Sequence, residues 1–347
     1  MTSTHRRTVS GAIKAMRGLA TASLVAGGGF LYSATALATP TAAPTTDTGE
    51  ASGTAFAPYV DVSSSPAYDL VATANETGVR HFTLAFVGAG DRCAPLWGGH
   101  SALNANDVAS QIDELRAEGG DVRVSFGGGS GRELAVACSG VDELAAAYGR
   151  VIDDFDLTRV DFRIGGVALS DRAAHTRRAQ AVARLQKKHP DLDVSFTLPA
   201  RPEGLPRSAV TLLADAHRHG VTISTVNIWA TAPGAKRGGD LERLVERAAT
   251  ATQRQVRKVL GLPDGPAWQK VGITPTVGVN DEGGTFTVGD ARRLVEFAQR
   301  HGAGRLSMWA AGRDQPCEHG ATHARTSSCS SVDQEPLAFT KVFGTYR

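Results

Sequence analysis

Short apolar segments that alternate with helical segments limit the possible folds of this chain more than any other feature. Eight segments rich in β-branched and aromatic residues predict strands, at residues 56–62, 81–87, 122–126, 159–164, 193–198, 222–229, 271–277 and 305–309. Apolar residues recur with a helical period at residues 105–118, 141–155, 172–188, 207–219, 240–260 and 288–300. This alternation over about 290 residues predicts an α/β fold, a single (β/α)8 TIM barrel.

An open doubly wound sheet is the alternative arrangement of the same elements. That fold would place a glycine fingerprint after the first strand. Here the first strand runs instead into Asp61-Val62-Ser63-Ser64-Ser65-Pro66. We therefore favour the barrel, in which chemistry takes place at the carboxyl ends of the strands.

The first 38 residues predict a secretory signal peptide. Four basic residues precede an apolar run over residues 19–37, and residues 1–38 contain no acidic residue. Ala36-Leu37-Ala38 provides a small-residue cleavage site. The pair Arg6-Arg7 leaves both the general and the twin-arginine export routes open. An uncleaved membrane anchor is the alternative to cleavage. We expect a secreted protein with no membrane contact after the signal is removed.

Residues 39–55 are rich in Thr, Ala and Pro and predict a flexible linker, so the barrel domain is expected over residues 56–347. The whole chain has a formal net charge of +2, and the basic excess lies in the predicted signal. The remaining domain has no large basic field, which argues against a nucleic-acid partner. We expect this domain to be a monomer.

Four cysteines lie in the part expected to be exported: Cys93, Cys138, Cys317 and Cys329. An oxidising compartment favours disulfides, and four cysteines allow three pairings. We favour Cys93–Cys138 and Cys317–Cys329, of which the second closes a short loop near the end of the chain.

A zinc site is the alternative use of the second pair. Cys317 and Cys329 could in principle join His319 and His323 as two sulfur and two nitrogen ligands. Their spacing matches no usual zinc pattern, so we expect neither a metal nor a cofactor.

Several segments of the predicted domain carry a family resemblance. They are Phe56-Ala57-Pro58-Tyr59-Val60-Asp61, Phe82-Thr83-Leu84-Ala85-Phe86, Trp97-Gly98-Gly99, Val124-Ser125-Phe126-Gly127-Gly128, Leu157-Thr158-Arg159-Val160-Asp161-Phe162, Val226-Asn227-Ile228 and Leu306-Ser307-Met308-Trp309. In this order they resemble the bacterial family-18 glycoside hydrolases (chitinases), in particular the short single-domain actinobacterial type. The resemblance covers essentially all of residues 56–347. The cysteine positions also resemble that group, which supports the favoured pairing.

The resemblance implies a substrate-assisted mechanism, in which the acetamido oxygen of the sugar attacks its own anomeric carbon. The family uses a glutamic acid as proton donor and an aspartic acid two residues earlier to orient the acetamido group, in the pattern Asp-Phe-Asp-Ile-Glu-Gly. This chain reads Asp161-Phe162-Arg163-Ile164-Gly165-Gly166. The proton donor is therefore replaced by Gly165 and the assisting aspartate by Arg163, whereas Asp161 is retained. Strand alternation places these three residues on one face, where we expect Arg163 to pair with Asp161.

The sixth strand departs from the family in the same way. The family's Met-Asp-Tyr turn supplies an aspartate and a tyrosine, but this chain has Ala232 and Pro233 at those positions, within Asn227-Ile228-Trp229-Ala230-Thr231-Ala232-Pro233-Gly234. No catalytic group of the family is intact. A positioned general acid alone contributes about 10²–10⁴-fold to the rate.

We therefore expect a secreted chitinase-like pseudoenzyme that binds, at most, chito-oligosaccharide or a related glycan. A weak or altered family-18 hydrolase acting on chitin is one alternative. A protein-binding, inhibitor-type barrel is the other.

Aromatic residues at strand ends are the candidate sugar-binding residues. Trp309 ends the last strand, where the resemblance implies the floor of the sugar site. Trp229 replaces the family's usual Met, and Tyr59 and Phe86 lie on early strands. Packing in the barrel core is the alternative role for each ring. Asp161 completes the predicted site.

Two further clusters are expected to be structural. The run Gly127-Gly128-Gly129-Ser130-Gly131 lacks the ending of a phosphate-binding loop, and the resemblance implies close backbone packing there. A basic cluster on the predicted helix 172–188 should be a solvated face; it comprises Arg172, Arg177, Arg178, Arg184, Lys187 and Lys188.

Overall fold

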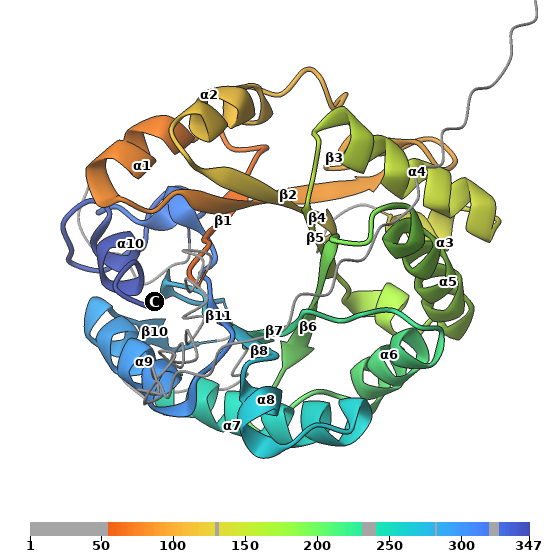
Figure 1. Ribbon diagram of the computed structural model, residues 1–347. Coiled ribbons are helices and arrows are strands. Elements are labelled where there is room, and N and C mark those ends of the chain that lie inside the picture. The colour runs from red at the N-terminus through yellow and green to blue at the C-terminus, as the bar shows by residue number, and fades with distance from the viewer. Residues whose placement is uncertain (1–54, 129–131, 231–240, 282, 319–325) are drawn as a thin grey trace, which may run out of the picture. The chain divides into compact units, whose positions relative to one another are not determined.

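Parallel strands follow one another in sequence order around a central axis (Figure 1). The computed structural model describes residues 55–128, 132–230, 241–281, 283–318 and 326–347. The predicted signal peptide and nearly all of the predicted linker lie outside these residues, as do Ala232, Pro233, His319 and His323. Neighbouring strands are β1 (Tyr59–Asp61), β2 (His81–Ala89), β4 (Asp121–Gly127), β5 (Arg159–Arg163), β6 (Asp193–Ala200), β7 (Thr225–Ala230), β8 (Val271–Thr274) and β11 (Arg305–Leu306).

The sheet closes between its first and last strands. Phe56 forms a parallel bridge with Leu306, and the Tyr59 amide donates to the Met308 carbonyl at 3.0 Å. Closure pairs the remaining strand edges, as a parallel barrel requires. The prediction of a (β/α)8 TIM barrel is therefore confirmed.

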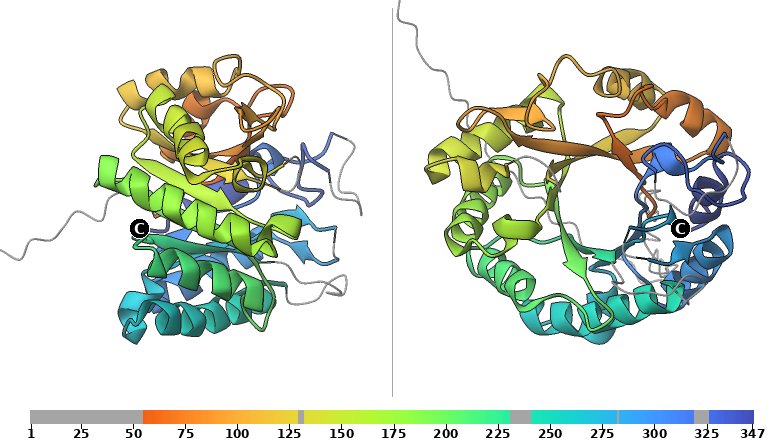
Figure 2. Two further views of the ribbon diagram at one scale, coloured as in Figure 1. Left: turned by 90° about the vertical axis from the view of Figure 1, so that its right-hand side faces the viewer. Right: turned by 180° about the vertical axis from the view of Figure 1, so that it is seen from behind.

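Helices form a ring outside the strands (Figures 1 and 2). They are α1 (Leu70–Thr77), α2 (Ile112–Ala117), α3 (Leu134–Ala137), α4 (Val141–Asp154), α5 (Arg172–Lys188), α6 (Arg207–Arg218), α7 (Leu241–Leu260), α8 (Asp264–Trp268), α9 (Val288–His301) and α10 (Ala338–Phe343). The predicted helix at 105–118 is shorter than expected, because a 3-10 turn at Ala109–Gln111 precedes α2. No helix among the described residues is long and apolar enough to cross a membrane.

Short strands outside the barrel sheet's main path lie at its carboxyl end. Strand β3 (Pro95–Trp97) pairs antiparallel with β2. Strands β9 (Gly278–Val279) and β10 (Thr285–Phe286) form a separate hairpin between β8 and α9. The periodicity of the sequence predicted none of them, because each contains only two or three residues.

Both favoured disulfides are present. Cys93 is bonded to Cys138 and Cys317 to Cys329, with Cα–Cα separations of 4.8 and 5.2 Å. The Cys317–Cys329 bond leaves no thiolate for zinc, so the zinc alternative is wrong.

Arg178 is the exception in the basic cluster of α5. Its side chain is buried, and its Nη2 lies 2.7 Å from Oε2 of Glu133, which precedes α3. The Tyr148 hydroxyl, from α4, donates to the same carboxylate at 3.1 Å. Arg184 and Lys188 lie on the solvated face, as expected. The prediction was wrong for Arg178 because helical position alone does not reveal an acidic partner 45 residues away.

The buried pair allows a test of the fold. Glu133→Ala should lower the free energy of unfolding by about 3–5 kcal/mol, because it leaves the Arg178 cation buried and unpaired. The double variant Glu133→Leu, Arg178→Met should lose much less, since no buried charge remains. Urea unfolding measures both. Arg184→Ala, which removes an exposed cation from the same helix, is the control. A single-variant loss no larger than that of the control would contradict this account.

Candidate functional site

Four aromatic side chains meet at the carboxyl end of the barrel. The ring centroids of Trp229 and Trp309 are 4.9 Å apart, and Phe86 stacks on Trp309 at 5.4 Å. Tyr59 lies 5.8–6.1 Å from each of the other three rings. The structure thus brings together all the aromatic residues predicted for the site. Phe86, Trp229 and Trp309 are partly exposed, whereas Tyr59 is fully buried.

Two glycines at the end of β4, Gly127 and the following Gly128, allow this arrangement. A Cβ on Gly127 would lie 2.2 Å from the Arg163 carbonyl oxygen, and a Cβ on Gly128 would lie 2.8 Å from the Phe86 ring. Both glycines also have positive φ, at +101° and +109°, which other residues rarely adopt. The close backbone packing expected at Gly127 and Gly128 is confirmed, and the rest of that glycine run lies outside the described residues.

The Asp161 carboxylate occupies the centre of the barrel. Its Oδ1 accepts hydrogen bonds from Ser195 at 2.7 Å and Thr197 at 2.8 Å. Its Oδ2 accepts from Ser125 at 2.6 Å and Tyr59 at 3.0 Å. An ionised carboxylate has about four lone-pair sites, so its acceptor capacity is full.

Asp161 and Tyr59 therefore support the site from below instead of lining it, as both are fully buried. This corrects the prediction that they contact the ligand. Burial raises the pKa of the Tyr59 hydroxyl well above its usual value, and the charge of Asp161 adds to the effect. The phenol stays protonated and remains a hydrogen-bond donor to Asp161.

Asn227 on β7 extends this network and was not singled out from the sequence. Its amide nitrogen donates to Thr197 at 3.0 Å, and its amide oxygen accepts from Thr274 on β8 at 2.9 Å. The available signal was polar residues at inward positions of otherwise apolar strands, which Ser125, Thr197 and Asn227 share.

Arg163 ends β5 and does not form the expected ion pair with Asp161. Its guanidinium carbon lies 4.6 Å from the centre of the Trp229 ring, a cation–π arrangement. Among the residues that the structure describes, Nε and Nη1 of Arg163 are buried without a hydrogen-bond partner. Desolvation lowers the pKa of Arg163, opposed by its attraction to Tyr59 and Asp161. The pair does not form because the Asp161 oxygens are already occupied.

Gly165 lies directly against that guanidinium. A Cβ built on Gly165 would lie 2.6 Å from Nη1 of Arg163. A larger side chain at residue 165 would therefore have to displace the arginine. Ala232 and Pro233, the other two positions predicted to be replaced, lie outside the described residues.

A cavity of about 220 Å³ adjoins the aromatic cluster. Phe86 and Trp309 form part of its wall, together with Asp61 and Ser63 from the end of β1. The Asp61 carboxylate accepts hydrogen bonds from the amide and the hydroxyl of Ser63, at 3.0 and 2.6 Å. This cavity thus combines aromatic faces with a carboxylate.

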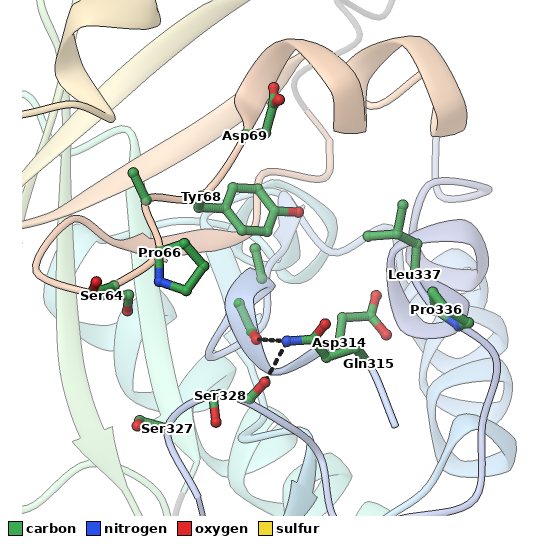
Figure 3. A pocket seen from close by; sticks show the side chains of 14 residues that line it. Ser64, Pro66, Tyr68, Asp69, Asp314, Gln315, Ser327, Ser328, Pro336 and Leu337 are labelled. Carbon is green, nitrogen blue, oxygen red and sulfur yellow. Dashed lines mark hydrogen bonds between the residues drawn. The ribbon is translucent and has the colours of Figure 1, made fainter. Parts of the chain in front are cut away.

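A second hollow, of about 320 Å³, lies beside it between the segment after β1 and the C-terminal segment (Figure 3). Ser64, Tyr68 and Ser328 contribute to its walls, and the Gln315 amide donates to the Ser328 carbonyl at 2.6 Å. The Asp314 carboxylate accepts from the Thr340 amide at 2.6 Å, so it stabilises the start of α10. No group of three or more His, Cys, Asp or Glu in the described part of the chain is placed to hold a metal ion.

Two curated proteins are similar to this chain in sequence. A probable bifunctional chitinase/lysozyme from Escherichia coli K12 is 34% identical over 277 residues, which cover 75% of this chain and 31% of that protein. Endochitinase 11 from Metarhizium anisopliae is 33% identical over 275 residues, covering 75% of this chain and 52% of that protein. The chain thus spans about a third and about half of the length of these relatives. No family model matches it.

Solved structures give a fuller match. Active domain 2 of a chitinase from Pyrococcus furiosus is 31% identical with a TM-score of 0.74, and the match covers 84% of this chain and 94% of that domain. Catalytic-site mutants of the same domain have been crystallised with chito-oligosaccharides. A GH18 chitinase from Pseudoalteromonas aurantia, 17% identical with a TM-score of 0.53, shares the fold. The sequence identity across nearly the whole Pyrococcus domain, together with the closed parallel barrel, shows that this chain belongs to the family-18 glycoside hydrolases.

Proposed function

We propose that this protein is an exported, non-catalytic member of the family that binds a glycan at the carboxyl end of its barrel. The main support for this proposal is the contact between the Arg163 guanidinium and Gly165. The family's mechanism needs a carboxyl group at each of these two positions. The relatives named above are described as chitinases, and one is known with chito-oligosaccharides. Oligomers of N-acetylglucosamine are therefore the ligand class to test first.

The chemistry of these two positions supports the loss of hydrolysis. Glycine has no proton to give to the leaving oxygen. The Arg163 cation would repel the positive charge that develops on the sugar. Because the site is partly desolvated, water screens this repulsion only weakly. Asp161 is no substitute donor, because it is fully buried and accepts four hydrogen bonds.

The aromatic faces support retained binding. Phe86, Trp229 and Trp309 are partly exposed next to a cavity, and apolar ring faces of this kind pack against the C–H face of a pyranose. Tyr59 and the network below it hold these rings in place. Export is supported by the two disulfides, since such bonds persist in oxidising compartments.

Hydrolysis is the first test. The purified protein, incubated with labelled chito-oligosaccharides, should release no reducing ends above the blank, or at least about 10²–10⁴-fold fewer than an active relative. The Pyrococcus domain serves as the active control. Cleavage at a rate normal for the family would refute the proposal. Slow cleavage abolished by Asp61→Asn would instead identify an altered hydrolase that uses the carboxylate of the cavity wall.

Restoring the missing groups is a stricter test of the assignment. Gly165→Glu alone should remain inactive, because the new side chain meets the Arg163 guanidinium and the acetamido-orienting groups are still missing. The fourfold variant Arg163→Asp, Gly165→Glu, Ala232→Asp, Pro233→Tyr rebuilds the family's set and should show the first measurable release of reducing ends. Strong activity of the single variant would show that the other three positions matter less than we argue.

Trp309 tests the binding site itself. Trp309→Ala should weaken chitotetraose binding about tenfold or more in isothermal titration, because the ring face on which the pyranose packs is lost. Trp268→Phe, which alters a tryptophan on α8 that stacks on His301, is the matched control and should bind normally. If the wild type binds no oligosaccharide but captures a secreted protein, the protein-binding alternative is favoured.

A further inference from the structure

We infer that the ligand of this site carries a carboxylate, which Arg163 binds. This inference deepens the proposed function and rests on it. It specifies the class of glycan: an oligosaccharide with an acidic sugar, instead of neutral chitin.

The charges along the barrel axis are unbalanced. Arg305 is buried below Asp161, at the amino-terminal end of β11, and its three guanidinium nitrogens have no hydrogen-bond partner among the described residues. Arg163 lies on the opposite side, at the carboxyl end. Asp161 attracts both cations, but it carries a single negative charge. Within the described part of the chain, this axis is therefore short of one anion.

Neighbouring carboxylates do not supply it. Glu133 lies behind Gly127, with its Cγ 3.6 Å from the position of an added Cβ there, but it pairs with Arg178 at 2.7 Å. Asp193 pairs with Arg123 at 2.7 Å. Asp61 bonds to Ser63 beside the neighbouring cavity. None of these acids forms a hydrogen bond with Arg163, so two buried nitrogens of this half-buried side chain keep unused donors, which is costly unless a ligand supplies acceptors.

The planar shape of the Arg163 guanidinium favours a carboxylate as the anion that it binds. A guanidinium presents a planar fork that matches the two oxygens of a carboxylate. The Trp229 ring, 4.6 Å away, restricts the plane of that fork. Gly165 adds no side chain beside Nη1, and the position of its absent Cβ is only 2.6 Å from that atom. Nη1 itself is closed to solvent, so a carboxylate would have to enter the space beside residue 165 to reach it.

The aromatic rings place the sugar relative to that carboxylate. Trp309 contacts Trp229 at 4.9 Å and stacks on Phe86 at 5.4 Å. A pyranose packed on these faces would hold a carboxylate substituent next to Arg163. Uronic acids and hexosamines with a lactyl ether share this chemistry, and the probes below distinguish them.

The test compares matched oligosaccharides by isothermal titration. The probes are chitotetraose, a hyaluronan tetrasaccharide, which carries uronic acids, and a disaccharide of N-acetylglucosamine and N-acetylmuramic acid, which carries a lactyl carboxylate. At least one acidic probe should bind the wild type about tenfold more tightly than chitotetraose, and added salt should reduce that preference. Arg163→Ala should bring the ratio of acidic to neutral affinity close to one. Arg163→Lys should keep part of it, because the charge remains but the fork is lost.

Two controls separate recognition from folding. Arg150→Ala removes an exposed arginine of α4 and should leave the ratio unchanged. Arg163→Ala should melt at or above the wild-type temperature, because it removes a half-buried charge whose Nε and Nη1 have no hydrogen-bond partner among the described residues.

The outcomes distinguish this inference from the proposed function. Equal affinities of the wild type for acidic and neutral probes would overturn the inference, and Trp309-dependent chitotetraose binding would leave the proposed function standing. A preference that survives in Arg163→Ala would also overturn the inference. Absence of binding to every probe would overturn both.

Discussion

The Asp161 carboxylate joins four strands of the barrel at one point. It belongs to β5 and accepts hydrogen bonds from β1, β4 and β6. A buried charge is tolerated only when its acceptors are used, so these four donors must stay in place. This requirement holds Tyr59 in place, and the three partly exposed aromatic rings contact Tyr59. Because these bonds occupy both Asp161 oxygens, Asp161 does not accept a hydrogen bond from Arg163. Asp161 thus organises the polar core of the barrel and leaves the charge of Arg163 unpaired by any carboxylate of the described residues.

The residues of the candidate site and the residues that stabilise the fold lie in different layers of the barrel. The inward residues Ser125, Thr197 and Asn227 form the polar core. Arg163 and Gly165 lie beyond it, at the carboxyl end, where substitutions change chemistry more than stability. The chain is therefore 31% identical to a Pyrococcus chitinase domain while Arg163 and Gly165 stand at its candidate site.

The sequence predicted much of this structure because its strongest signals are local. Periodicity located the strands, and the favoured disulfides are those of the structure. The ungapped pattern from Asp161 to Gly166 predicted replaced catalytic positions, which stays a prediction. Partners far apart in sequence were harder to predict. Arg178 was expected to be solvated, but it is buried and paired with Glu133. Arg163 was expected to pair with Asp161, but donors from three other strands already occupy the Asp161 oxygens. Asn227 was overlooked since a single polar residue in an apolar strand does not reveal what it contacts.

The contact between Gly165 and Arg163 has a consequence for any acid introduced at residue 165. The two positions are coupled, because a side chain at residue 165 requires the end of the flexible Arg163 side chain to shift. A carboxyl group placed there would stand beside a cation, which lowers the pKa of a carboxyl group. The residue at position 163 therefore determines how readily an acid at position 165 can hold a proton.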